Sequence, residues 1–324
     1  MKRKHSSFLR TVMKLLCLLL GLVLAGMLTV TAYVIHLQEQ MSGAGSGTLP
    51  PSDSTGATLL SSLPGAAPPP INILLIGQDR REGEAGNRSD SIILCTFHPA
   101  DGKLILTSVL RDLYVPIPGH GSNRINAAYA FGGRELLQKT MEQNFDIQID
   151  GIVEVDFSQF SQIIDLLGGV DITLRKDEAR LISEETGTNL SAGPQRLNGL
   201  QALSYSRIRK LDANGDLSRT SRQRTVLEAI VTAYKNADIS TLLKTTIKIL
   251  PMVTTDMSQG SLIKHAMTLF PKLSEIDMIS QRIPADGQFT DQTIDGMSVL
   301  VADMDLLKEH LKNAISGNSE EPAQ

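Results

Sequence analysis

Aromatic residues and cysteines are scarce in this chain of 324 residues. There is no tryptophan, and phenylalanine, tyrosine and tryptophan together make up only 4% of the sequence. A module dedicated to binding carbohydrate is expected to expose more aromatic side chains than this. The two cysteines, Cys17 and Cys95, lie in separate apolar runs, which argues against a disulfide between them. The composition therefore disfavours a pure carbohydrate-binding module and a disulfide-stabilised scaffold.

Several motifs of common enzyme sites are also missing. The sequence has no Gly-x-Ser-x-Gly elbow, no P-loop and no cysteine in a polar setting that would suit a nucleophile. His98, His120 and His265 show no spacing typical of metal ligands. A histidine or cysteine metal centre is therefore not expected, which leaves carboxylates as the candidate ligands for any metal ion.

Acidic residues outnumber basic ones once the N-terminus is set aside. The first fourteen residues carry five cations and no acid, which leaves 26 lysines and arginines against 35 acidic residues in the rest of the chain. A general nucleic-acid-binding protein needs a broad basic face. We therefore expect no nucleic-acid partner, and a site for an anion has to arise from local clustering of cations.

Residues 15–35 form a single run of 21 residues without a charge, which is long enough to cross a bilayer as a helix. Because the basic tail 1–14 precedes this run, we expect the N-terminus in the cytoplasm and the body outside, on a single-pass membrane protein. The alternative is a cleaved signal peptide, whose apolar core is usually about 7–15 residues long. The greater length here predicts a retained transmembrane helix in the cell membrane.

A flexible linker is predicted over residues 36–70, because 17 of the thirty residues of 41–70 are glycine, serine or proline. The body, residues 71–315, follows it, and the tail 316–324 is expected to be disordered. Strand-like runs in the body occupy residues 71–76, 91–97, 103–109, 151–157, 170–174, 278–283 and 297–302. Helix-like runs occupy residues 125–131, 135–143, 160–167, 199–205, 220–236, 239–250, 261–270 and 304–315, the last with Asp303 as its N-cap. Interleaved strands and helices predict one α/β domain whose sheet is covered on both faces.

Arginine is concentrated in two segments of the body. Residues 77–111 and 207–224 together hold nine arginines and two lysines, whereas the rest of the chain holds eight arginines and twelve lysines. The planar guanidinium group binds phosphate or carboxylate oxygens in pairs, which the lysine ammonium group cannot do. A solvated surface gives no reason for this preference, so the bias indicates a site for a multiply charged phosphate ligand.

The second segment reads "YSRIRKLDANGDLSRTSRQRT". Arg207 and Arg209 alternate, as on an extended stretch or at a helix end, and Asp216 is a candidate cap for the following helix. In that helix Arg219, Arg222 and Gln223 are spaced three and four residues apart, so they share one face near an N-terminus that favours anions. The alternative is an amphipathic surface helix with ordinary salt bridges. Arg134 and Arg180, outside both segments, are expected to be ordinary surface arginines.

Two carboxylates, Asp79 and Asp90, flank the charged stretch between the first two strands. Carboxylates at a sheet edge, together with phosphate oxygens and water, suit Mg²⁺, with Mn²⁺ as the alternative ion. It is also possible to interpret each acid as a neutralising partner of a neighbouring arginine. The metal hypothesis and the ion-pair hypothesis both follow from the residues alone.

These residues lie within stretches that resemble the LytR–CpsA–Psr family, the cell-wall glycopolymer ligases of Gram-positive bacteria. The stretches, in order, are "NILLIGQDRR", "NRSDSIILCTFHP", "LTSVLRDLYVPIPGHG", "NRINAAYAFGG", "LLGGVDITL", "LNGLQALSYSRIRK" and "DLSRTSRQR". The resemblance covers the anchor and residues 71–228. It implies a catalytic domain over residues 71–315, with a central mixed β-sheet sandwiched between α-helices and a long apolar channel for a polyprenyl chain.

The resemblance also assigns roles to individual residues. It implies that Asp79 and Asp90 hold Mg²⁺. The residues implied to bind the substrate pyrophosphate are Arg88, Arg111, Arg207, Arg209, Arg219 and Gln223. The residues implied to be catalytic are Arg81, Arg111, Asp112 and Asp216. The chain departs from the family's usual residues at Gln78, Arg80 and Arg124, which leaves its polymer preference open.

The function implied is that of a membrane-anchored phosphotransferase with an extracellular catalytic domain. Its donor would be an anionic glycopolymer of teichoic acid or capsule type, linked to polyprenyl pyrophosphate, and its acceptor a peptidoglycan hydroxyl, with a phosphodiester as the product. One alternative is hydrolysis of the polyprenyl pyrophosphate by water. The other is a non-catalytic regulatory or binding protein of the cell envelope.

Overall fold

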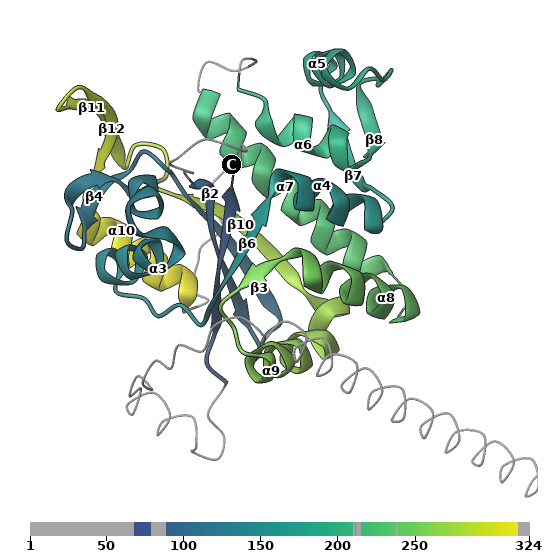
Figure 1. The fold of residues 1–324 in the computed structure, drawn as a ribbon, viewed down its shortest axis with the longest axis horizontal. Coiled ribbons are helices and arrows are strands. Elements are labelled where there is room, and N and C mark those ends of the chain that lie inside the picture. The colour runs from purple at the N-terminus through teal and green to yellow at the C-terminus, as the bar shows by residue number, and fades with distance from the viewer. Residues whose placement is uncertain (1–67, 79–88, 210, 212–214, 238, 317–324) are drawn as a thin grey trace, which may run out of the picture. The chain divides into compact units, whose positions relative to one another are not determined.

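The computed structural model describes residues 68–78, 89–209, 211, 215–237 and 239–316 (Figure 1). All of them belong to one compact unit. The predicted basic tail, transmembrane helix and C-terminal tail, and nearly all of the predicted linker, lie outside the described residues, so those predictions stay untested. Among the helices that are described, none combines the length and the apolar character needed to span a membrane.

A six-stranded mixed sheet forms the centre of the unit. Its strands are β1 (Ile71–Gln78), β2 (Ser89–His98), β3 (Lys103–Val109), β6 (Gly151–Asp156), β9 (Thr254–Thr255) and β10 (Asp277–Ile283). They are ordered β10-β3-β2-β1-β6-β9. The β1–β6 and β3–β10 pairs are parallel, and the other pairs are antiparallel. The predicted central mixed sheet is therefore confirmed.

One face of this sheet is covered by α3 (Ile125–Phe145) and α10 (Met304–Ile315) (Figure 1). Alternate side chains of β1, such as Leu74 and Ile76, point to this face and join a buried cluster with Leu137 of α3 and Leu311 of α10. This alternation follows from the two-residue period of a strand. The predicted N-cap of α10 is also confirmed, because Asp303 Oδ1 accepts a hydrogen bond from the backbone N–H of Asp305 at 3.0 Å.

The opposite face packs against α7 (Gly215–Asn236), α9 (Gln259–Leu269) and the 3₁₀ helix η2 (Phe270–Glu275). Leu106 of β3 lies here in a second cluster that includes Leu227 and Val231 of α7 and Leu273 of η2. Burial of apolar side chains at about 25 cal/mol per Å² is the main force that holds such layers together. Helices therefore cover both faces, as the interleaved sequence pattern predicts.

A third buried cluster joins α7 to a group of smaller elements. These are α4 (Phe157–Leu166), β7 (Val170–Leu174), α5 (Lys176–Thr186), β8 (Gly193–Leu197) and α6 (Gly199–Arg207). The remaining elements are α8 (Ile239–Ile249), η1 (Leu250–Met252) and two hairpins, β4 (Tyr114–Ile117) with β5 (Gly121–Arg124) and β11 (Phe289–Ile294) with β12 (Met297–Ala302). The third cluster fixes the end of α6 against the start of α7, where the second arginine segment lies.

The sequence pattern predicts the long elements better than the short ones. Every predicted strand and helix run falls on an observed element, but 125–131 and 135–143 belong to α3, which breaks at Gly132 and Gly133. The pattern misses α5 and the short strands β4, β5, β8, β9 and β11. These strands are only two to six residues long, and β4, β5 and β8 contain glycine or proline, so they give too little periodicity to be recognised.

Candidate functional site

The carboxyl ends of four strands meet at one edge of the central sheet. In the parallel pair of β1 and β6, the last residues Gln78 and Asp156 lie side by side. In the parallel pair of β3 and β10, the last residues Val109 and Ile283 do the same. Gln78 also pairs with Ser89, at the start of the antiparallel strand β2. Gln78 and Ser89, the described residues that flank the first charged stretch in the sequence, therefore lie at this edge, where open α/β sheets commonly bind ligands.

Several predicted site residues fall in or next to this connection. Asp90 is the second residue of β2, so its backbone lies at the sheet edge. Asp79, Arg81 and Arg88 lie outside the described residues. The described part of the chain contains no group of three or more histidine, cysteine or acidic side chains that could hold a metal ion. The predicted role of Asp79 and Asp90 as Mg²⁺ ligands therefore stays a prediction, although carboxylates are donors that Mg²⁺ prefers.

Asp112 lies between two arginines just beyond the end of β3. Its Oδ2 is 3.4 Å from Nε of Arg111, and its Oδ1 is 3.1 Å from Nη1 of Arg124. All three side chains are a quarter exposed or less. The β4–β5 hairpin brings Arg124 back beside Asp112, and a backbone hydrogen bond from Asn126 to the carbonyl of Arg111 closes the arrangement. Asp112 thus orients two guanidinium groups, and Arg124 is a site residue to which the sequence reasoning assigned no role.

Arg207 and Arg209 lie on either side of a buried residue. Arg207 is the last residue of α6, and its guanidinium carbon lies 4.9 Å from the centroid of the Phe157 ring, a cation–π contact. Ile208 between them is only 3% exposed, whereas both arginines are exposed. The predicted helix end is confirmed, and the alternation presents both guanidinium groups outward from one anchored backbone.

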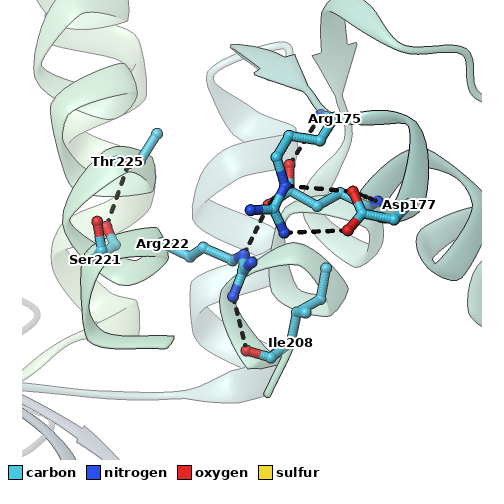
Figure 2. A network of polar contacts seen from close by, with 7 residues as sticks. Arg175, Asp177, Ile208, Ser221, Arg222 and Thr225 are labelled. Atoms are coloured by element: carbon cyan, nitrogen blue, oxygen red, sulfur yellow. Dashed lines mark hydrogen bonds and ion pairs between the residues drawn. The ribbon is translucent and has the colours of Figure 1, made fainter. Parts of the chain in front are cut away.

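Arg222 supplies the anchor for that backbone (Figure 2). Its Nη1 donates a hydrogen bond to the carbonyl oxygen of Ile208 at 3.2 Å, and its Nε donates to Oε1 of Glu178 at 2.9 Å. The Arg222 and Glu178 side chains are only 5% and 6% exposed. Oε2 of Glu178 accepts the backbone N–H of Arg175 at the start of α5. A buried ion pair therefore ties α5, α7 and the Arg207–Arg209 segment together.

This pair corrects the prediction that Arg219, Arg222 and Gln223 form one ligand-facing surface. Arg222 is buried, and its guanidinium group binds Glu178 and the carbonyl oxygen of Ile208, so in this structure it positions other residues. The alternative of a solvated surface helix is also wrong here, since Arg219 is only 3% exposed and Gln223 is half-buried. Asp216 lies inside the first turn of α7, which begins at Gly215, and not at the predicted N-cap.

Replacing Glu178 by glutamine is expected to lower the free energy of unfolding by about 3–5 kcal/mol, because it leaves the Arg222 charge buried and without its counter-ion. The matched control is Glu184→Gln on the same helix. Glu184 pairs with Arg180 at 2.9 Å, but both side chains are more than half exposed, so the loss should stay below about 1 kcal/mol. Urea denaturation of both variants measures the difference, and equal losses would contradict a structural role for the buried pair.

Two further arginines extend the site toward β10. Nε of Arg224 on α7 donates a hydrogen bond to Oγ of Ser280 at 2.9 Å, and Arg282 lies two residues further along the same strand. Burial, reinforced by the charge of Arg282, lowers the pKa of Arg224 to about 10. Carboxylates already accompany both arginines: Arg282 pairs with Asp286, and the charge of Glu228 partly offsets the lowering of the Arg224 pKa. Arg282 lies outside both arginine-rich segments. The clustering of arginine along the sequence therefore gives no sign that Arg282 lies near Arg224.

Arg134 differs from the sequence expectation. It follows the break in α3, and its Nη1 lies 3.3 Å from Oε2 of Glu154, whose side chain is only 7% exposed. It also pairs with Glu135 at 3.0 Å. The prediction of an ordinary surface arginine is therefore wrong for Arg134, because its partner is a buried carboxylate on β6, whereas it is confirmed for Arg180.

Comparison with known proteins agrees with this arrangement. The LytR-CpsA-Psr family model matches residues 52–316. A polyisoprenyl-teichoic acid–peptidoglycan teichoic acid transferase, TagU of Oceanobacillus iheyensis, is 42% identical over 165 residues, which are 49% of this chain and 50% of the relative. The regulatory protein MsrR of Staphylococcus aureus is 40% identical over 162 residues, 49% of this chain and 48% of the relative. The chain thus spans about half the length of these relatives.

Among solved structures, the fold resembles the LytR-CPS2A-psr family protein YwtF (TagT) with bound octaprenyl pyrophosphate lipid. The two share 27% sequence identity and a TM-score of 0.59, over 76% of this chain and 91% of that protein. The family model matches most of the sequence. The observed mixed sheet, with helices on both faces, is consistent with that match. The chain belongs to the LytR-CpsA-Psr family.

Proposed function

We propose that this chain is a phosphotransferase that moves an anionic glycopolymer from polyprenyl pyrophosphate to a hydroxyl of peptidoglycan. The observation that carries the proposal is that arginines from separate segments lie next to the carboxyl ends of strands of one sheet: Arg111 follows β3, and Arg207 stacks on Phe157, the residue after β6. Arg111 and Arg124 are oriented by Asp112, and Arg207 and Arg209 are held by the Arg222–Ile208 hydrogen bond. Such a set matches the paired, multiply charged oxygens of a pyrophosphate.

The names of similar proteins support the substrate class. TagU is named as a transferase that joins teichoic acid to peptidoglycan, and TagT is described with octaprenyl pyrophosphate bound. A polyprenyl pyrophosphate bears two phosphates next to an apolar chain, and it is this charged group that the arginine cluster would bind. Arg219 and Gln223 of α7, with Arg88 from the stretch between β1 and β2, are assigned to the same group by family resemblance, which implies a catalytic role for Arg81.

In the proposed reaction the acceptor hydroxyl oxygen attacks the phosphorus on the polymer side of the pyrophosphate. A new O–P bond forms, the phosphoanhydride bond breaks, polyprenyl phosphate leaves, and the hydroxyl proton passes to solvent or to a basic group. The guanidinium groups stabilise the negative charge that develops on the bridging and terminal oxygens. Asp79 and Asp90 would hold Mg²⁺, which supplies further neutralisation of phosphate charge when bound.

The test of this proposal is product analysis with the purified full-length protein, a lipid-linked polymer and peptidoglycan. Mass spectrometry of the digested wall should find polymer joined to a glycan hydroxyl by a phosphodiester. Free polymer phosphate in place of the joined product would favour hydrolysis. Failure to consume the donor would favour a non-catalytic role, the function suggested by the name of the similar protein MsrR.

We also propose that the folded unit stands outside the cell on a retained N-terminal anchor, since the cations before residue 15 precede an uncharged run of 21 residues. Protease added to intact, wall-stripped cells should then remove the unit and leave a small membrane-bound stub, detectable with a tag at the N-terminus. A body that resists the protease in intact cells, but is digested after lysis, would place the chain in the opposite orientation.

A further inference from the structure

Two rings from different elements stack on the surface beside the candidate site. His120, in the turn of the β4–β5 hairpin, and Phe131, in α3, lie with ring centroids 4.8 Å apart and an angle of 18° between their planes. Both residues are exposed, and Phe131 keeps 46% of its surface accessible despite the stacking. Isolated exposed apolar residues are common, but a stacked and still open ring pair in a chain this poor in aromatics is a defined surface feature.

The break in α3 is what places Phe131 there. Gly132 and Gly133 have non-helical backbone angles, with a φ of 66° at Gly133. A Cβ at Gly132 would come within 2.7 Å of the Leu136 side chain. Glycine therefore suits both positions of the break, since it alone readily adopts a positive φ and has no Cβ to clash.

The two chain segments that carry the rings contain no charged residue. A Cβ added at Gly119 or Gly121 would meet nothing within 4 Å, so the residues on both sides of His120 are open to solvent. Residues 117–123 and 129–133 contain no lysine, arginine, aspartate or glutamate. The nearest arginines along the chain, Arg124 and Arg134, are paired with Asp112 and Glu154. This surface suits a neutral ligand with apolar ring faces and flanking hydroxyl groups, and it offers no complement to a polyanion.

The ring pair is also at a suitable distance from the proposed reaction. The hairpin runs from the Tyr114–Arg124 pair, next to Asp112, to the Ile117–Gly121 pair near its tip. Three residue steps of a strand span about 10 Å. A sugar chain bound at the rings could therefore extend one of its hydroxyl groups toward the arginine cluster, while the sugar attached directly to the donor pyrophosphate would lie at the cluster itself.

We propose that His120 and Phe131 form a subsite for the neutral glycan chain of the acceptor. The inference rests on the proposed function and names the surface that would hold the peptidoglycan strand. The apolar C–H face of a pyranose ring packs on the Phe131 ring, and the exposed hydroxyl of Ser122 in the hairpin offers a hydrogen-bond partner to the sugar's polar edge. The lack of lysine and arginine in these two segments, with the Lys308 ammonium group nearby paired with Asp305, is the reason to assign the ring pair to the acceptor and not to the anionic donor.

The experiment measures binding and transfer with full-length Phe131→Ala, Phe131→Tyr and a control, Ile247→Ala. Ile247 is 44% exposed on α8, so the control removes an equally exposed apolar side chain elsewhere. With soluble, uncross-linked peptidoglycan strands as the probe, Phe131→Ala should weaken binding and raise the acceptor KM about tenfold. Binding of polyprenyl pyrophosphate should not change, and Phe131→Tyr and Ile247→Ala should stay within about twofold of the wild type.

The outcomes separate this inference from the proposed function. Unchanged strand binding by Phe131→Ala, or an equal loss of donor binding, would overturn the acceptor subsite. A wild-type protein that binds donor but not the strands would also overturn it. A wild-type protein that binds the strands through Phe131, yet transfers no polymer, would leave the subsite standing and refute the transferase.

Discussion

Alanine in place of Asp79 or Asp90 is expected to lower transfer by at least about a thousandfold while the domain stays folded. In the sequence Asp79 directly follows Gln78, the last residue of β1, and Asp90 is the second residue of β2. If they hold Mg²⁺ against the pyrophosphate, each variant loses several kcal/mol of stabilisation of phosphate charge, which corresponds to a factor of this size. Transfer from a lipid-linked polymer, measured with added Mg²⁺, provides the readout.

Asp101 supplies the matched control for these two substitutions. It lies in the turn between β2 and β3, at the opposite end of the same sheet, and pairs with Lys103 at the surface. Asp101→Ala should leave transfer unchanged. The metal hypothesis would be refuted by an Asp79→Ala or Asp90→Ala protein that keeps normal activity, or by a wild-type protein that works equally well after chelation of divalent ions.

Lysine in place of Arg111, Arg207 or Arg209 is expected to reduce binding and transfer roughly ten- to a hundredfold. Lysine preserves the positive charge but not the planar pair of donors, and each lost charge-assisted hydrogen bond is worth roughly 1.5–3 kcal/mol. Arg207→Lys also weakens the stacking on Phe157. Arg219→Lys belongs to the same series, with a thermal unfolding measurement beside it because Arg219 is buried.

The controls for the lysine series are chosen from the structure. Arg180 and Arg196 are more than half exposed and pair with exposed acids, so lysine should replace each of them with almost no effect. Arg134 is not a suitable control, because its partner Glu154 is buried. A flat series, in which Arg111, Arg207 and Arg209 tolerate lysine as Arg180 does, would show that the cluster supplies only net charge.

The sequence predicts the location of the arginine site better than its internal contacts. Arg207 and Arg209 could be assigned to a helix end because their spacing is local. The role of Arg222 could not be predicted, since its partner Glu178 lies 44 positions away on α5, a helix that the periodicity does not reveal. A local pattern reports which residues share a face of a helix, but not which of them is buried by a distant partner.

The contacts around Asp112 and Phe131 could not be predicted from the sequence for a related reason. Arg124 reaches Asp112 because the β4–β5 hairpin turns the chain back, and its four-residue strands lack a clear alternation of apolar side chains. The stacking of Phe131 on His120 depends on the same turn and on the break at Gly132 and Gly133. Short hairpins and helix breaks are set by tertiary packing, so sequence patterns predict the sheet and long helices more reliably than such contacts.

The most direct test of the central claim is to identify the lipid that the full-length protein carries when it is gently extracted from its own cells. Native mass spectrometry of the wild-type protein should find a polyprenyl pyrophosphate, with or without attached sugars. The Arg207→Lys/Arg209→Lys double variant should carry at least tenfold less, and the Arg180→Lys control should carry the wild-type amount. Equal lipid loading of all three proteins, or a bound lipid without a pyrophosphate group, would contradict the assignment of the arginine cluster.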